Sequence, residues 1–484
     1  MNAVVPDPRR WQALALVCVA FFMTVLDVSI VNVALPSIGR HLHFSDTGLQ
    51  WVITAYAITF GGFLLLGGRA ADLLGRRKLF LIGVALFSAA SLVCGFSTST
   101  TMLIAARAVQ GFGAAVVSPA TLSIITTTFD EGAERNKALG IWGAMGGSGA
   151  AAGVLFGGIL TKYLGWQWIF FVNVPVGALV LAFAPRVVRE SRAPGERTGF
   201  DVVGASSVTA GLALLVYAIS KAPTDGWTDV TTIVLLVAAA VLLAFFVAWE
   251  ARVTAPIMPL RIFRVRTLAG ANIVGVLLGA SVFANFFLLT LYVQNVLGFS
   301  ALKTGLTFLA TAGTTVIVAA LSQWLTTKYG PRPVMAAGLA LNTGGLIWYS
   351  QIPVHGSYVS DLLPGYLMVG FGLALAFIPV SIAALAGVGP RDAGLASGLI
   401  NTSQQVGGAI GVAIASSVAV SRITHLLHRG ASNAVALTSG YSLAFSVVAG
   451  ISAAGVVTAL VFIKGGNLAE VEAEADLEAA EAMA

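Results

Sequence analysis

The chain has 484 residues, of which 57% are hydrophobic and only 10% are charged, and its formal net charge is +6. A soluble domain carries about 25% charged residues, so this composition excludes a soluble globular protein and makes the lipid bilayer the solvent for most of the chain. The cations are spread over short loops without a long basic tract, which excludes a nucleic-acid-binding protein.

Taken in chain order, the apolar runs predict an all-α integral membrane protein with fourteen transmembrane helices. The first run begins at Trp11 and is too long for the hydrophobic region of a signal peptide, so we expect it to be retained. The second and third runs flank a charged loop, Gly68 to Lys78, and each can cross a core of ~30 Å at ~1.5 Å per residue. The predicted spans are 11–35, 48–67, 79–98, 101–127, 137–161, 166–185, 201–220, 229–250, 267–291, 304–326, 333–351, 362–386, 394–420 and 440–463.

The loops indicate a topology and an internal duplication. An even number of spans, with most of the 27 Lys and Arg residues on one side, predicts that both termini are cytoplasmic. Gly75 and Gly330 each open a Gly-x-Arg loop after corresponding spans, and glycine-rich helices follow both at similar distances. Two six-helix bundles, as in secondary transporters, would cover 1–195 and 261–464. We expect two extra linker helices in 196–260 and an acidic cytoplasmic tail in 465–484.

Asp27 is the one carboxylate that the prediction places well within a span, and Arg107 is the one cation. We expect the first span to leave the membrane outward near Val33 and the fourth to enter it from outside near Thr101. Asp27 and Arg107 each lie six residues, or ~9 Å of helix rise, from these points, so they can share one depth and interact. An acid in the membrane costs about 2.5–3.5 kcal/mol on insertion scales and indicates a functional site, here a proton carrier released from Arg107 on protonation. The alternatives are a structural ion pair and an arginine that only braces helices through backbone carbonyls.

The charged loop predicts a conformational latch on the cytoplasmic side. Gly68 and Gly75 permit close approach and positive φ. Asp72 can bind a helix N-terminus or pair with an arginine such as Arg76 or Arg77. The alternative is that the loop cations only set the topology.

The remaining candidates serve packing or substrate binding. On the fifth span, small residues at four-residue spacing predict close, sliding helix contacts, although a purely structural role is equally compatible. The stripe comprises Gly149, Gly153, Gly157 and Gly158. Polar and aromatic residues on helices that should border a central cavity are substrate-binding candidates, with ordinary packing as the alternative. They are Tyr56, Trp142, Asn285, Phe286, Asn401 and Gln404.

The sequence lacks the motifs of ATP-driven transporters and of several enzyme and metal-binding classes. The chain contains no GxxxxGK[ST], HExxH, GxSxG or CxxC motif, so we expect no ATP use, no enzyme activity, no metal site and no cofactor. The expected partners are protons, a small-molecule substrate and the lipid bilayer, and we expect a monomer.

Together these motifs resemble the major facilitator superfamily, and most closely its fourteen-span drug:proton antiporters. Val154 stands where the antiporter pattern on the fifth helix has proline, and Leu73 stands at a position that is often basic. The resemblance implies a bacterial plasma-membrane exporter. The matching residues are Asp27 and Ala34–Pro36, the loop residues Gly68, Asp72, Gly75, Arg76 and Arg77, then Arg107, Gln110, Gly111 and Gly113, the fifth-span glycines, Gly165–Phe170, Asn173–Pro175, Gly394–Gly398, Asn401, Gln405 and Gly407.

The sequence therefore predicts proton-coupled export of amphipathic drugs or antibiotics, cationic compounds included, by alternating access. Two alternatives stay open. One is a narrow exporter of a single endogenous metabolite, and the other is a membrane sensor or scaffold that transports nothing.

Overall fold

A computed structural model describes residues 8–129, 133–191, 201–253, 256, 260, 265–385 and 393–465, and within these ranges all regular structure is helical. The first half of the chain contains α1 (Arg10–Leu42), α2 (Asp46–Leu49), α3 (Trp51–Leu74), α4 (Arg76–Gly95), α5 (Thr100–Thr128), α6 (Ala133–Tyr163), α7 (Trp168–Phe171) and α8 (Asn173–Val187). Next come α9 (Val202–Asp225) and α10 (Val230–Glu250). The second half contains α11 (Arg266–Leu291), α12 (Ala301–Tyr329), α13 (Pro331–Tyr349), α14 (Leu363–Leu385), α15 (Ala393–His428) and α16 (Asn433–Phe462), with π-helical turns at Tyr292–Val296 and Tyr358–Leu362.

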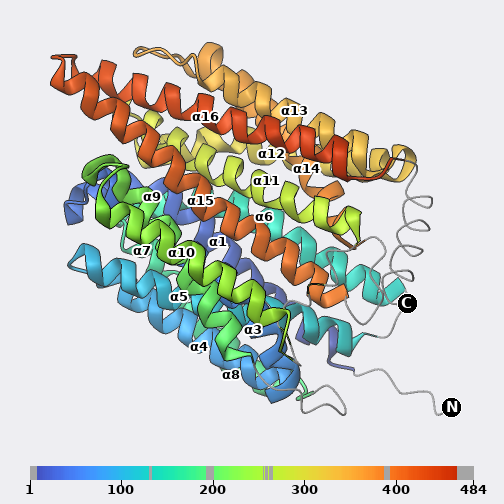
Figure 1. The fold of residues 1–484 in the computed structure, drawn as a ribbon. Helices are drawn as coiled ribbons and strands as arrows, with labels where there is room; N and C mark the ends of the chain where they lie inside the picture. Colours follow the sequence, from blue (N-terminus) through green and yellow to red (C-terminus); the bar gives the residue numbers. More distant parts are fainter. Residues whose placement is uncertain are drawn as a thin grey trace.

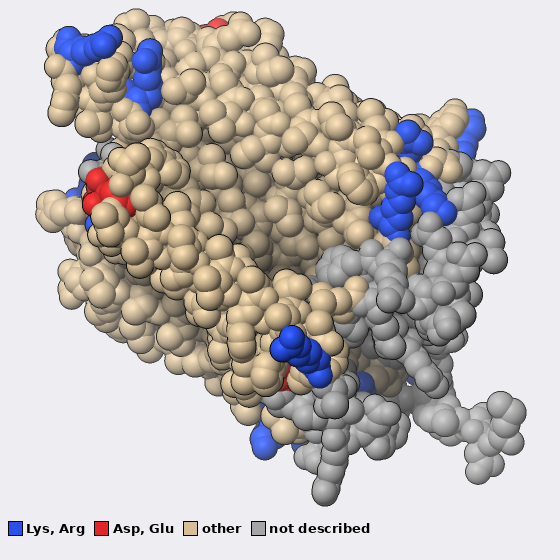
Figure 2. All heavy atoms as spheres, in the orientation of Figure 1, with Lys and Arg blue, Asp and Glu red and all other residues tan. Residues whose placement is uncertain are grey.

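Eleven spans among the described residues are long and apolar enough to cross a membrane. The predicted multi-pass, all-helical fold is thus confirmed, whereas the count of fourteen stays a prediction, because α3, α6 and α13 fall outside these eleven. Figure 2 shows the Lys and Arg side chains mainly near the two ends of the helices, with a broad uncharged belt between them. Such a belt is what a bilayer requires of a surface, since charge in hydrocarbon is costly.

Helix ends differ from the prediction at several places. Helix α1 continues through Pro36 to Leu42, α15 extends to His428, and α16 already begins at Asn433. An apolar run marks only the part of a helix that lies in hydrocarbon, and these helices continue beyond it with polar residues. The sixth predicted span is interrupted, because α7 ends at Phe171 and α8 begins at Asn173.

The two halves lie side by side, and α1 begins and α16 ends at the same end of the bundle, here called the terminal end (Figure 1). At the opposite end, one large apolar cluster includes residues of both halves, such as Val33 and Leu288. A hydrogen bond also crosses there, from Gln294 Nε2 to the carbonyl oxygen of Val33 at 2.8 Å. At the terminal end the apolar clusters are separate, one within the first half and one within the second.

One face of α12 shows how the halves diverge. Near its start, Gly305 is buried against the backbone of Val154 on α6. Further along the same face, towards the terminal end, Val316 is 58% exposed. Exposure rises along the series Gly305 (buried), Leu309 and Ala312 (half-buried), and Val316, Ala320 and Gln323 (exposed). The halves therefore touch at the opposite end and separate towards the terminal end.

Helix α9 lies across the boundary between the halves, packed against both α3 and α15, and α10 packs on α9. Thr209 of α9 fits against Gly62 of α3, and Ser417 Oγ of α15 donates a 2.7 Å hydrogen bond to the carbonyl of Ile219. The boundaries predicted at 195/196 and 260/261 lie outside the described residues or beside them, so this division stays a prediction.

Candidate functional site

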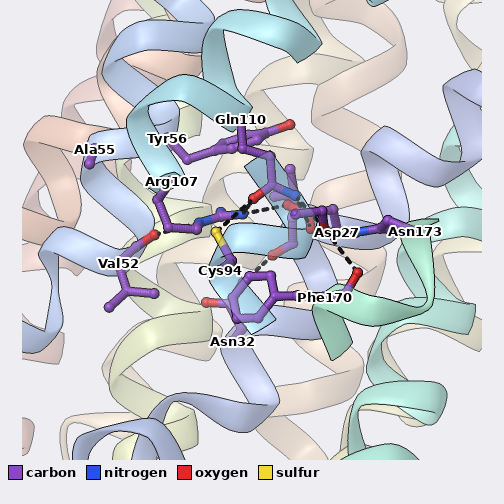
Figure 3. Close-up of polar contacts among 12 residues, drawn as sticks. Asp27, Asn32, Val52, Ala55, Tyr56, Cys94, Arg107, Gln110, Phe170 and Asn173 are labelled. Carbon is purple, nitrogen blue, oxygen red and sulfur yellow. Dashed lines mark hydrogen bonds and ion pairs between the residues drawn. The ribbon is translucent and has the colours of Figure 1, made fainter. Parts of the chain in front are cut away.

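The two ionisable residues predicted within the spans are in direct contact. Arg107 Nη1 on α5 donates to Asp27 Oδ2 on α1 at 2.5 Å, and the two side chains are 1% and 0% exposed. Figure 3 shows the guanidinium aimed at the carboxylate. Helix α1 continues to Leu42, past the predicted span 11–35, but the depth argument was counted from the expected membrane boundary and not from the end of the helix.

Neutral donors complete the coordination of the carboxylate. Asp27 Oδ1 accepts hydrogen bonds from Gln110 Nε2 at 2.8 Å and from Asn173 Nδ2 at 2.9 Å. Both amides also donate to Ser91 Oγ, at 3.1 and 3.0 Å, and Ser91 in turn donates to the carbonyl of Phe170 at 2.9 Å. We call Asp27, Ser91, Arg107, Gln110 and Asn173 the coupling cluster. A buried charge is tolerable only with such a full set of partners.

The guanidinium of Arg107 is held from three further directions. Its Nε donates to the carbonyl of Val52 at 2.9 Å, and Nη1 also donates to Gln110 Oε1 at 2.7 Å. The ring of Tyr56 lies 4.3 Å from the guanidinium carbon, a cation–π distance. Because these partners do not include Asp27, Arg107 keeps much of its environment if the carboxylate becomes neutral.

Glycines on α5 make this approach possible. A β-carbon on Gly111 would collide with the backbone carbonyl of Tyr56, and one on Gly113 would lie 2.7 Å from the amide nitrogen of Phe87. Helices α3 and α4 can therefore pack against α5 at backbone distance. This spacing brings Val52 within reach of Arg107 and Ser91 within reach of Gln110.

The predicted latch loop contacts its own half of the molecule. Gly75 has φ 113° and ends α3, and Arg76 N–H donates to the carbonyl of Ser191 at 3.0 Å. The carboxylate of Glu190 accepts from the backbone N–H groups of Arg77 and Lys78, each at 3.1 Å, so it caps the first turn of α4.

Two further loop contacts complete this picture. The Arg77 side chain also approaches Glu190, at 3.8 Å. Gly68 faces Pro119 on α5, and a β-carbon on Gly68 would lie 3.3 Å from Pro119 Cβ. The side chain of Asp72 lies outside the described part of the structure, so its latch role stays a prediction.

The glycine stripe of α6 serves two different contacts. Gly149, Gly153 and Gly157 face α1, and a β-carbon on Gly153 would lie 2.7 Å from the carbonyl oxygen of Leu26. Gly158 instead faces the second half, where a β-carbon on Gly158 would lie 2.7 Å from Leu302 Cα. The stripe thus packs α6 tightly on α1 and, at its last member, forms part of the contact between the halves.

The substrate-binding candidates do not form one group in this conformation. Tyr56 belongs to the surroundings of Arg107, and Asn285 is 2% exposed in the core of the second half. Trp142 is half-buried, stacks on Phe21 at 4.2 Å and donates to Thr121 Oγ1. The other three differ in exposure: Phe286 is half-buried and stacks on Phe308, Asn401 is exposed, and Gln404 is 8% exposed.

Sequence reasoning assigned no role to four residues that shape these sites. Gln110 and Asn173 were noted only as parts of family patterns, yet a carboxamide in an apolar run one turn from Arg107 was a usable signal. Ser91 carried no such signal, since a lone hydroxyl is common in membrane helices. Glu190 lies far from this loop in the sequence, and only the fold brings it to the start of α4.

Comparison with known proteins agrees with this architecture. Residues 17–412 match the Major Facilitator Superfamily, and the chain belongs to that family. The chain is 38% identical over 465 residues to the "Puromycin resistance protein pur8" of Streptomyces alboniger, covering 95% of this chain and 92% of that one. It is 41% identical over 405 residues to the "Cephamycin export protein CmcT" of Amycolatopsis lactamdurans, covering 83% of each.

A third relative and a solved structure extend the comparison. The chain is 37% identical to the "Multidrug resistance protein Stp" of Mycobacterium tuberculosis, over 85% of this chain and 76% of that one. The crystal structure of "the POT family transporter PepTSo" has a TM-score of 0.69 at 14% identity, covering 93% and 97% of the two chains, and supports the fold alone. The predicted superfamily is therefore confirmed, and its relatives are named as antibiotic-resistance and export proteins.

Proposed function

We propose that the protein is a proton-coupled antiporter that exports amphipathic drugs or antibiotics across the bacterial plasma membrane by alternating access. One observation carries the proposal: a buried Asp27–Arg107 salt bridge in a chain whose relatives are named for antibiotic resistance and export. The excess of cations on one side supports a cytoplasmic terminal end. We further propose that the protein acts as a monomer, without ATP.

With the terminal end in the cytoplasm, the separation of the halves towards that end corresponds to an inward-open state. Asp27 is then paired with Arg107 and 0% exposed, as expected after its proton has left and before the drug-loaded protein turns outward. A proton arriving from outside would neutralise Asp27 and remove the ionic part of the pair, whereas Arg107 keeps its bonds to Val52 and Gln110. Coupling requires that Asp27 reach water when the opposite end opens.

The energetics permit such an exchange. One proton that falls through about 100 mV releases about 2.3 kcal/mol, and each pH unit adds about 1.4 kcal/mol. One proton could therefore hold a gradient of a neutral drug of roughly 500-fold. A monovalent cation exchanged for one proton gains only the pH contribution, roughly tenfold per unit, so cationic substrates would require more than one proton per cycle.

Uptake into inverted membrane vesicles tests the proposal. We expect Asp27→Asn to abolish accumulation driven by a pH gradient, because the amide cannot carry a proton. The control is Asp229→Asn, which alters a half-buried helix cap on α10 and should leave uptake unchanged. Normal proton-driven accumulation by the Asp27→Asn protein would remove Asp27 from the mechanism.

The narrow exporter of one metabolite remains a second candidate, favoured because pur8 and CmcT are each named for a single antibiotic. A substrate panel separates the two functions: protection against many unrelated dyes and biocides supports multidrug export, and protection against one compound supports the narrow exporter. A sensor or scaffold would instead give no pH response of vesicles to any compound in the panel.

A further inference from the structure

Two polar side chains near the start of α3 are buried without a hydrogen-bond partner. Gln50 is 0% exposed, and neither atom of its amide group has a partner. Thr54, one helical turn later, is also 0% exposed, and its hydroxyl has none. Leaving a buried polar group unsatisfied is energetically costly, so such groups are rare and require an explanation.

This pair of residues faces the other half of the molecule. Ala57 and Gly61 continue the same face of α3 at helical spacing. Ala57 clusters with Ala409 of α15, and a β-carbon on Gly61 would lie 3.2 Å from Gln405 Cβ. Gln50 and Thr54 therefore lie in the boundary between α3 and α15 at the opposite end, where the halves are closed in this structure.

The same turn of α3 also holds Arg107. The carbonyl of Val52, between Gln50 and Thr54, accepts the 2.9 Å hydrogen bond from Arg107 Nε. Two residues beyond Thr54, the ring of Tyr56 lies against the guanidinium, with its centroid 4.3 Å from the guanidinium carbon (Figure 3). A displacement of Arg107 is thus passed directly to the backbone that positions the two unsatisfied side chains.

We propose that Gln50 and Thr54 are positioning residues that bias the protein towards opening at the opposite end. Closure there strips water from three polar atoms and gives them no protein partner, whereas opening returns them to water. When Asp27 is neutralised, Arg107 is no longer held by the ion pair, and a shift of its side chain moves the turn around Val52, to which it stays bonded, so that proton binding and opening favour one another. This last step depends on the proposed proton coupling, but the bias itself does not.

The test compares conformational populations of the full-length protein in lipid nanodiscs. Spin labels are attached through ketone-bearing residues at Thr98 and His355, two exposed positions on loops of different halves at the opposite end, which leaves both cysteines intact. Gln50→Met keeps the length of the side chain and removes the amide, and Thr54→Val removes the hydroxyl. We expect each change to lower the ratio of long to short label distances, by about tenfold for Gln50→Met.

A matched control separates this effect from the general loss of a hydroxyl. Thr326 is also 0% exposed, but its Oγ1 donates to Ser322 within the second half, so Thr326→Val should leave the distances unchanged. An unchanged or increased open population in Gln50→Met, or an equal shift in Thr326→Val, would overturn the inference. Proton coupling is judged separately, by whether the wild-type distances respond to pH.

Discussion

Removal of one partner of the buried ion pair should destabilise the protein far more than removal of both. Arg107→Met leaves the Asp27 carboxylate buried with only the amides of Gln110 and Asn173 as donors. Breaking a buried pair in this way typically costs about 3–5 kcal/mol, and the two remaining donors favour the lower end, about 3 kcal/mol. In the double variant Asp27→Asn/Arg107→Met no uncompensated charge is left, so most of that cost should disappear.

The assay is a double-mutant cycle on unfolding free energies, measured by tryptophan fluorescence during denaturant titration in mixed micelles. We expect a coupling energy of about 2 kcal/mol or more between the two sites, since residues in one buried network are not additive. Arg422→Met, which removes an exposed cation on α15, is the control and should change stability by less than about 0.5 kcal/mol. Additive effects of the two single changes would refute the view that the pair is a closed electrostatic unit.

Three further predictions concern the helix contacts and the loop. Gly153→Val should push α6 from α1 and reduce transport at least tenfold, whereas Gly450→Val, at a site with open space around it, should retain activity; equal activities would contradict the packing argument. Glu190→Gln should weaken the cap on α4 by about 1 kcal/mol, seen as faster hydrogen exchange at Arg77 and Lys78, and unchanged exchange would exclude the cap. Gly75→Ala should lower stability by about 1–3 kcal/mol in thermal unfolding, because φ is 113°; a neutral result would show that the loop relaxes freely.

The residues of the coupling cluster show how far sequence reasoning reached. The pairing of Asp27 with Arg107 could be predicted because each is the one charged residue in its apolar run, and an unpaired charge in the bilayer is energetically costly. Gln110 was within reach by helical spacing. Ser91 and Asn173 were not, because their role depends on α4 and on the break between α7 and α8 lying next to α1. The same holds for Glu190, whose partner lies 112 residues away in the chain.

Composition and hydropathy alone determined that this protein is a bundle of membrane helices with its charges at the ends. Lipid offers no hydrogen bonds, so an apolar run of that length has to become a helix. Only the tertiary structure decided that the halves close at one end and part at the other, and that Gln50 and Thr54 are buried in the closed boundary. Contacts between halves depend on how side chains from distant segments fit together, and no periodicity along the chain records that fit.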